Sequence, residues 1–144
     1  MWFDKRNPRA VYMDIRRESY VTPIANGRTD TIVVDPDILG DFTDIPFPDE
    51  SFRVVVFDPP HLVKRTVSLI TKRYGTLTGD WRSMLRAGCA ECFRVLRPGG
   101  VLIFKWSECQ FPVREILDLT PVAPLFGHRS GKRSATHWMT FMKD

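Results

Sequence analysis

The strongest constraint on the fold is the run of residues 54–61, in which four apolar residues lead into an acid, two prolines and a histidine. Three of the four apolar residues are β-branched, which favours a strand buried on both faces. Proline cannot donate to a strand ladder, and the pair of prolines also prevents an immediate helix, so the strand ends at Asp58. The pattern therefore holds an acidic side chain at the carboxyl end of a buried strand, where open α/β sheets bind ligands.

A helix and a second strand follow this first strand. Asp80 is an expected N-cap, and apolar residues recur after it at spacings of three and four until the glycine turn at 98–100. Residues 101–106 are again apolar and predict a second buried strand. A strand, helix and strand in this order form a right-handed unit with parallel strands, which places the chain in the α/β class.

The flanking segments contain shorter secondary-structure patterns. We expect a strand over 9–15 that ends near Asp14, mostly loop over 16–30, and either a strand or a lead-in segment at 31–34. Three further expectations complete the chain: a long loop over 62–79 with one or two helical turns near 67–74, a short helix over 112–119, and a hairpin of 124–129 with 136–142.

Length and composition indicate one soluble domain over residues 1–144. The chain is 43% hydrophobic and 26% charged, which suffices for a core. Its longest apolar runs are far shorter than the roughly 20 residues of a membrane span, and its start is charged, so we expect no signal peptide and no anchor. Three cysteines, an odd number, predict reduced thiols and a cytoplasmic protein.

Two sequence segments resemble those of the class I S-adenosylmethionine-dependent methyltransferases. They are the proline-rich turn at 44–52 and the segment 94–100, and the order of predicted elements over roughly 10–142 is similar to that family. More narrowly, the chain resembles small phage and bacterial methyltransferases of DNA. The resemblance implies a Rossmann-like sheet, mostly parallel, with a carboxy-terminal antiparallel hairpin and helices on its faces.

The sequence at 58–61 resembles the Asp-Pro-Pro-aromatic signature of DNA enzymes that methylate amines. The resemblance implies that the catalytic residues are Asp58, Pro59, Pro60 and His61. An exocyclic amine on a base is a poor nucleophile because its lone pair is delocalised into the ring. Hydrogen bonds from the amine to the Asp58 carboxylate and the Pro59 carbonyl would localise that pair. The family's aromatic residue stacks on a flipped base, and here the position is His61.

The resemblance also implies S-adenosylmethionine as the cofactor. Asp14 corresponds to the acid that accepts hydrogen bonds from the ribose, Asp41 and Phe42 to the pair that lines the adenine, and Asp58 faces the same crevice. The alternative interpretation is that Asp14 and Asp41 are strand-end caps or turn formers.

A second predicted group lies at the end of the strand at 101–106. In a parallel sheet, Lys105 and Trp106 lie beside Asp58, where they could bind substrate. The alternative for Trp106 is a buried core residue. Cys89 and Cys92 have a zinc-like spacing but lie on the apolar side of the predicted helix, which favours small buried hydrophobes over metal ligands.

The family's first strand and glycine-rich turn should precede the strand at 9–15. Fewer than about ten residues stand there, too few for a strand, a turn and a helix of usual length. Residues 1–5 resemble the end of that unit, so we expect an amino-terminally shortened domain that lacks the first strand. A start codon placed too far downstream, a decayed gene, and a chain that binds another ligand are three open explanations.

Charge is unevenly distributed. Residues 31–60 hold seven acids against one base, whereas residues 61–99 hold eight bases against two acids. The basic segment could attract nucleic acid, or it could be solvated helix surface. Two functions therefore stay open: a methyltransferase that acts on an amine of a nucleic-acid base, or a non-catalytic remnant or nucleic-acid-binding module.

Overall fold

The computed structural model describes residues 4, 6–63, 69–131 and 135–144. The chain falls into two compact units, Met1–Asp41 and Phe42–Asp144, and each is described by itself. The expectation of a single domain over 1–144 stays a prediction. The interpretation of residues 1–5 as the end of a missing unit falls mostly on residues outside the described part of the chain.

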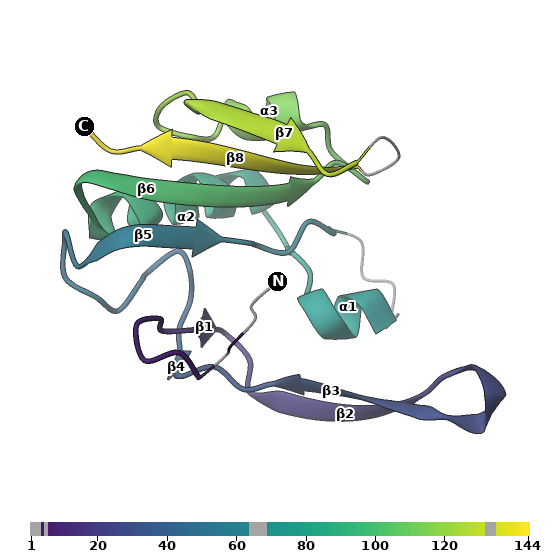
Figure 1. Ribbon diagram of the computed structural model, residues 1–144. Helices are drawn as coiled ribbons and strands as arrows, with labels where there is room; N and C mark the ends of the chain where they lie inside the picture. Colours follow the sequence, from purple (N-terminus) through teal and green to yellow (C-terminus); the bar gives the residue numbers. More distant parts are fainter. Residues whose placement is uncertain (1–3, 5, 64–68, 132–134) are drawn as a thin grey trace. The chain divides into compact units, whose positions relative to one another are not determined.

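The carboxy-terminal unit is built on a four-stranded sheet. The strands are β5 (Phe52–Phe57), β6 (Leu96–Ser107), β8 (Thr136–Met142) and β7 (Phe126–Arg129), and they lie in that order (Figure 1). β5 and β6 are parallel, whereas β6 with β8 and β8 with β7 are antiparallel. The predicted parallel unit and the predicted carboxy-terminal hairpin are both confirmed, and the unit is mixed α/β.

The helix α2 (Trp81–Val95) covers one face of this sheet, as Figure 1 shows. Asp80 is its N-cap, because its carboxylate accepts hydrogen bonds from the backbone N–H and the hydroxyl of Ser83. Leu85 and Cys89 of α2 are fully buried, as are Leu102 and Phe104 of β6. The predicted helical spacing thus produces the core of the unit. The short helix α3 (Val113–Leu117) follows Pro112 as predicted and buries Ile116.

The prediction that the strand around Val54 is buried on both faces is wrong. β5 is the outermost strand of the four, and the Val54 side chain is 53% exposed. Among the β5 residues only Phe57, at the carboxyl end, is buried, because it lies beneath α2. The apolar composition of β5 is that of a strand with neighbours on both sides, although β6 is its one partner within the described sheet.

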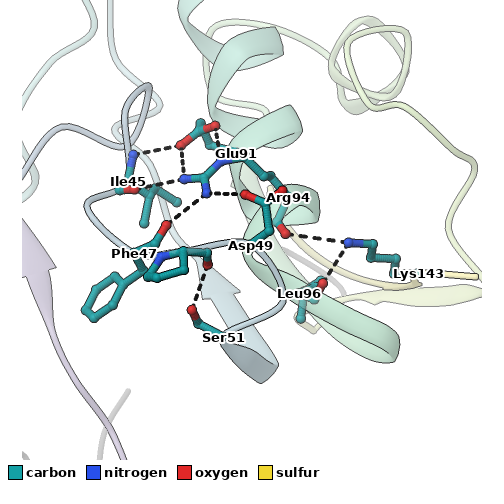
Figure 2. A network of polar contacts seen from close by, with 9 residues as sticks. Ile45, Phe47, Asp49, Ser51, Glu91, Arg94, Leu96 and Lys143 are labelled. Carbon is teal, nitrogen blue, oxygen red and sulfur yellow. Dashed lines mark hydrogen bonds and ion pairs between the residues drawn. The ribbon is translucent and has the colours of Figure 1, made fainter.

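A network around Arg94 fastens the proline-rich turn to the end of α2 (Figure 2). The Arg94 guanidinium donates to the backbone carbonyls of Ile45 and Phe47 and to the carboxylates of Glu91 and Asp49, at 2.7–2.9 Å. These bonds raise the pKa of Arg94, and the Arg94 hydrogen bond lowers the pKa of Glu91. The network thereby joins the segment at 44–52 to the carboxyl end of α2.

A second cation, Lys143, donates hydrogen bonds to backbone carbonyls at the carboxyl end of α2. Lys143 Nζ donates to the carbonyl of Leu96 at 2.7 Å, and its backbone pairs with that of Gly99 and Gly100. Leu96 pairs with Phe52 of β5, so β6 begins five residues earlier than the predicted start at Val101. Gly99 has a positive φ of 71°, which permits the turn within the segment.

The amino-terminal unit contains two pairs of strands. β1 (Met13–Asp14) and β4 (Ile38–Leu39) are parallel, and β2 (Glu18–Pro23) and β3 (Thr29–Val34) form an antiparallel hairpin. The short 3₁₀ helix η1 (Ala25–Gly27) lies at the tip of this hairpin.

The prediction of loop over residues 16–30 is therefore wrong, and the segment 31–34 is a strand. Asn26 and Gly27, which we interpreted as breakers, both take left-handed φ values (63° and 68°), as hairpin turns require. The expected strand at 9–15 is confirmed over the two residues of β1.

The last element is the helix α1 (Leu69–Tyr74), which confirms the expected helical turns near 67–74 within the described residues. Across the described part of the chain, no helix is long and apolar enough to cross a membrane.

Candidate active site

The parallel register of β5 and β6 brings Asp58 and Lys105 together. Phe57 pairs with Phe104, so Asp58, just past the carboxyl end of β5, stands beside Lys105, which lies two residues before the end of β6. Lys105 Nζ donates to Asp58 Oδ2 at 2.7 Å. The Asp58 and Lys105 side chains are 26% and 23% exposed. The pair is thus reachable from solvent while partly shielded from it, which strengthens its interactions with a ligand.

Two aromatic rings flank the lysine. Lys105 Nζ lies 6.0 Å from the ring centre of Tyr74, at the end of α1, and 5.8 Å from that of Trp138. Trp138 reaches this position because it stands opposite Lys105 in the antiparallel register of β6 and β8. Both rings are near the distance limit of a cation–π contact, so they favour the cation where it stands.

His61 lies in the segment that follows the two prolines. Its ring centre is 6.2 Å from that of Tyr74 and 6.5 Å from that of Trp106. Backbone bonds fix the next two residues, because Leu62 accepts from the N–H of Leu77 and the N–H of Val63 donates to Gln110. The histidine is therefore held beside the aromatic side chains.

Burial lowers the pKa of His61 below its usual value, and Lys105 adds to the effect while the Asp58 carboxylate opposes it. At neutral pH the imidazole is therefore uncharged. A neutral, flat ring beside two other aromatic rings has the properties of a stacking surface for a base.

Trp106, by contrast, is a buried core residue, as the alternative interpretation predicted. Its side chain is 1% exposed and its Nε1 donates to the carbonyl of Phe111 at 3.1 Å. Its ring centre lies 6.5 Å from that of His61, and its direct contact with a substrate stays a prediction.

Phe42 also packs in the interior of the carboxy-terminal unit. Its ring meets the edge of the Phe57 ring at 5.4 Å between centres. Gly88 of α2 makes room for it, because a Cβ there would overlap the Phe42 ring and lie 3.1 Å from the Phe57 ring. Phe42 therefore contributes to the packing between α2 and β5, and its expected contact with an adenine ring stays a prediction.

Asp14 and Asp41 follow neighbouring parallel strands of the amino-terminal unit. Asp14 ends β1, and Asp41 comes two residues after β4. The Asp14 carboxylate accepts hydrogen bonds from the backbone and the guanidinium of Arg16 at 2.9–3.2 Å. That arrangement is what the turn-forming alternative predicts. The two acids nevertheless stand at the same end of a parallel pair, as a role in ligand binding would need.

The two helical cysteines behave as small hydrophobes. Cys89 and Cys92 are buried in α2, and burial raises the pKa of the Cys89 thiol to about 12 and that of Cys92 still further. Among the described residues, no group of three or more His, Cys, Asp or Glu side chains could hold a metal ion.

Sequence reasoning missed Tyr74 and Trp138. Tyr74 lies in a segment without a sustained hydrophobic period, and Trp138 reaches the site only through strand pairing. The register of the carboxy-terminal hairpin, counted from the antiparallel alignment of residues 101–107 with 136–142, is the signal that would have found Trp138.

The chain has counterparts among solved structures. One is a protein of Thermus thermophilus provisionally named as a DNA modification methylase. The likeness has a TM-score of 0.50 at 19% sequence identity and covers 73% of this chain and 50% of that one. The chain thus has a methyltransferase-like fold and spans about half the length of this structural relative.

The sequence comparisons are negative: no protein-family model and no curated protein matches the chain. At 19% identity the structural likeness shows the fold alone, so function must be argued from the residues of the site.

Proposed function

We propose that this protein is an S-adenosylmethionine-dependent methyltransferase that acts on an exocyclic amine of a nucleic-acid base, as a DNA-modification enzyme does. The observation that carries the proposal is the Asp58 carboxylate. It stands at the carboxyl end of β5, next to the buried Pro59, with one oxygen bound to Lys105. The methyltransferase-like fold supports the proposal.

The chemistry needs an acceptor that concentrates the amine's lone pair. Asp58 Oδ1 and the Pro59 carbonyl accept hydrogen bonds from the amine, which turns its lone pair toward the methyl carbon. When bound, S-adenosylmethionine supplies that methyl group on a positively charged sulfur. The chemistry that the bound cofactor would supply is methyl transfer to the amine nitrogen, which would then release a proton to solvent by way of Asp58. His61 stacks on the base and keeps it in this position.

Within the amino-terminal unit, we assign the ribose hydroxyls of the cofactor to Asp14. Carboxylates accept hydrogen bonds from hydroxyls well, and the position of Asp14 and Asp41 at the same end of a parallel pair fits that role. Binding there requires Arg16 to share or release the Asp14 carboxylate. The adenine contact of Asp41 and Phe42 belongs to the same proposal.

The outer edge of β5 is the second part of the proposal. Its exposed Val54 and its apolar composition suit a further parallel strand, which would complete a Rossmann-like sheet. The family resemblance suggests a segment equivalent to the family's first strand as the occupant. Cofactor affinity is then expected to be higher in a chain that carries that segment.

Calorimetry with S-adenosylmethionine tests the proposal. The 144-residue chain and a version extended upstream in frame are titrated in parallel, and saturable binding by the extended version is expected. If neither version binds S-adenosylmethionine, the proposed methyltransferase activity is excluded. Binding of oligonucleotides in that case would favour the nucleic-acid-binding module that uses the basic segment at 61–99.

A further inference from the structure

The Asp58–Lys105 pair places a hydrogen-bond acceptor and a hydrogen-bond donor side by side at one strand-end corner. We propose that Lys105 determines which base the site accepts, and this inference rests on the proposed function. Lys105 donates a hydrogen bond to the ring nitrogen next to the reacting amine while Asp58 accepts from the amine. The corner thereby recognises the Watson–Crick edge of adenine or cytosine.

The pair has the unused bonding capacity that this task needs. The ammonium carries three donors, and one of them goes to Asp58 Oδ2. Among the described residues, the structure gives Lys105 no other hydrogen-bond acceptor and gives Asp58 Oδ1 no donor. The second carboxylate oxygen and two ammonium protons are therefore available to a ligand.

The pattern matches adenine and cytosine, in which an amine stands beside an unprotonated ring nitrogen on the Watson–Crick edge. On the Watson–Crick edge of adenine, the N6 amine donates and the adjacent N1 accepts, and in cytosine N4 and N3 stand in the same relation. Guanine and thymine instead carry a carbonyl beside a protonated ring nitrogen, which would set carbonyl against carboxylate and N–H against ammonium. A base must leave its helix to expose this edge, as an enzyme that flips its substrate requires.

The surroundings hold the lysine ready for this bond. A lysine side chain ordinarily loses much conformational freedom when it is fixed in one place. Tyr74 and Trp138 lie within 6.0 Å of the ammonium on α1 and β8, and the ion pair to Asp58 fixes its end. Because these contacts come from the protein's own side chains, the base meets a donor that is already in place.

A purely structural ion pair is the competing explanation. Both partners retain about a quarter of their exposure, and pairs of that kind contribute little to stability. The two explanations differ in what they predict for a base whose ring nitrogen has been replaced by carbon.

The experiment measures binding of single-stranded oligonucleotides that contain one central adenine, 1-deazaadenine or 7-deazaadenine. It uses the printed chain and the chain extended upstream, each as wild type, as Lys105→Met and as Arg86→Met. Arg86 is an exposed cation of α2, so its variant controls for the general loss of positive charge. Methyl transfer is measured on the same samples as a separate readout.

We expect wild type to bind 1-deazaadenine roughly tenfold to hundredfold more weakly than adenine, and 7-deazaadenine about as well as adenine. Lys105→Met should lose this discrimination, whereas Arg86→Met should keep it. Equal binding of adenine and 1-deazaadenine by wild type, or unchanged discrimination in Lys105→Met, would overturn the role of Lys105. Discrimination in binding with no methyl transfer would instead retain that role and remove the proposed catalysis.

Discussion

The protein contains two clusters in which a cation meets carboxylates, and they differ in what the cation binds. Arg94 donates to two backbone carbonyls as well as to Glu91 and Asp49. Lys105 donates to the side chain of Asp58 alone among the described residues, and aromatic rings flank it. The first cluster joins segments of chain, whereas the second joins two side chains of neighbouring strands at the point where β5 ends.

The difference indicates which cluster serves the fold and which serves a ligand. The Arg94 guanidinium has used its donors, so a ligand could bind there only by breaking the contact between α2 and the proline-rich turn. The Asp58 corner keeps a carboxylate oxygen and ammonium protons unused in the described structure, so a ligand can bind without disturbing the strands. We therefore expect variants of the two clusters to separate stability from activity.

The largest effect is expected from Asp58→Ala. Removal of the amine acceptor should lower methyl transfer by about 100-fold or more, because general-base and positioning effects of this kind contribute that much. Cofactor binding and the melting temperature should stay close to wild type. Asp49→Ala is the matched control, because Asp49 belongs to the Arg94 network and is 74% exposed. Equal rates for the two variants would remove Asp58 from the mechanism.

Arg94→Met should produce the opposite pattern. The variant leaves the carbonyls of Ile45 and Phe47 without their donor and leaves Glu91 with the N–H of Ile45 but no cation, so the melting temperature should fall by roughly 5 °C or more. Circular dichroism on heating measures this. Arg97→Met is the control, since Arg97 Nε donates to the single carbonyl of Glu50. A melting curve of Arg94→Met that superimposes on wild type would contradict the structural role.

The packing of Phe42 gives an intermediate effect. Gly88→Ala should destabilise the fold by about 1–3 kcal/mol, because the added methyl group overlaps the Phe42 ring and overpacking outweighs the better helix propensity of alanine. Urea unfolding measures the loss. Phe42→Leu in the same chain should restore part of it. If Gly88→Ala were instead neutral and weakened only cofactor binding, Phe42 would belong to the adenine site.

The smallest effect concerns pH. Burial lowers the pKa of His61 in the folded chain, and the charged groups that face it are Lys105 and Asp58, with Tyr74 adding its ring from α1. The folded state therefore prefers the neutral imidazole. This contribution is complete above the unfolded value near 6.5 and is lost as the pH falls through the lower folded value.

Wild type should thus lose stability between pH 7 and pH 5 relative to His61→Phe, by less than about 1 kcal/mol after solvent screening. Urea unfolding at several pH values checks this. A parallel pH dependence of the two proteins would show that His61 is not the group responsible.

The sequence predicted those parts of the fold whose signals are local and strong. The helix after Asp80 combines an N-cap with a sustained apolar period, and the strands around Val54 and Val101 are short apolar runs bounded by proline or glycine. In these cases neighbours along the chain determine the outcome. The position of Asp58 beside Lys105 also followed, because a strand, helix and strand in this order make the two strands parallel neighbours.

The parts that could not be predicted depend on pairing between distant segments. The hairpin of β2 and β3 was missed because Pro23 and Asn26-Gly27 were interpreted as breakers of regular structure. The exposure of Val54 depends on the absence of a second partner for β5 within the described sheet, which no local pattern reveals. Tyr74 and Trp138 join the site from α1 and β8, so only the register places them there.

The most direct test of the Asp58 corner is to identify the methylated atom. Mixed-sequence single-stranded DNA is incubated with the extended chain and S-adenosylmethionine that carries an isotopically labelled methyl group, and the digested nucleosides are analysed by mass spectrometry. We predict label on the exocyclic nitrogen of adenine or cytosine, formed about 100-fold or more slowly with Asp58→Ala. Label on carbon 5 of cytosine or on a ring nitrogen, or label that forms at the wild-type rate in Asp58→Ala, would contradict the assignment.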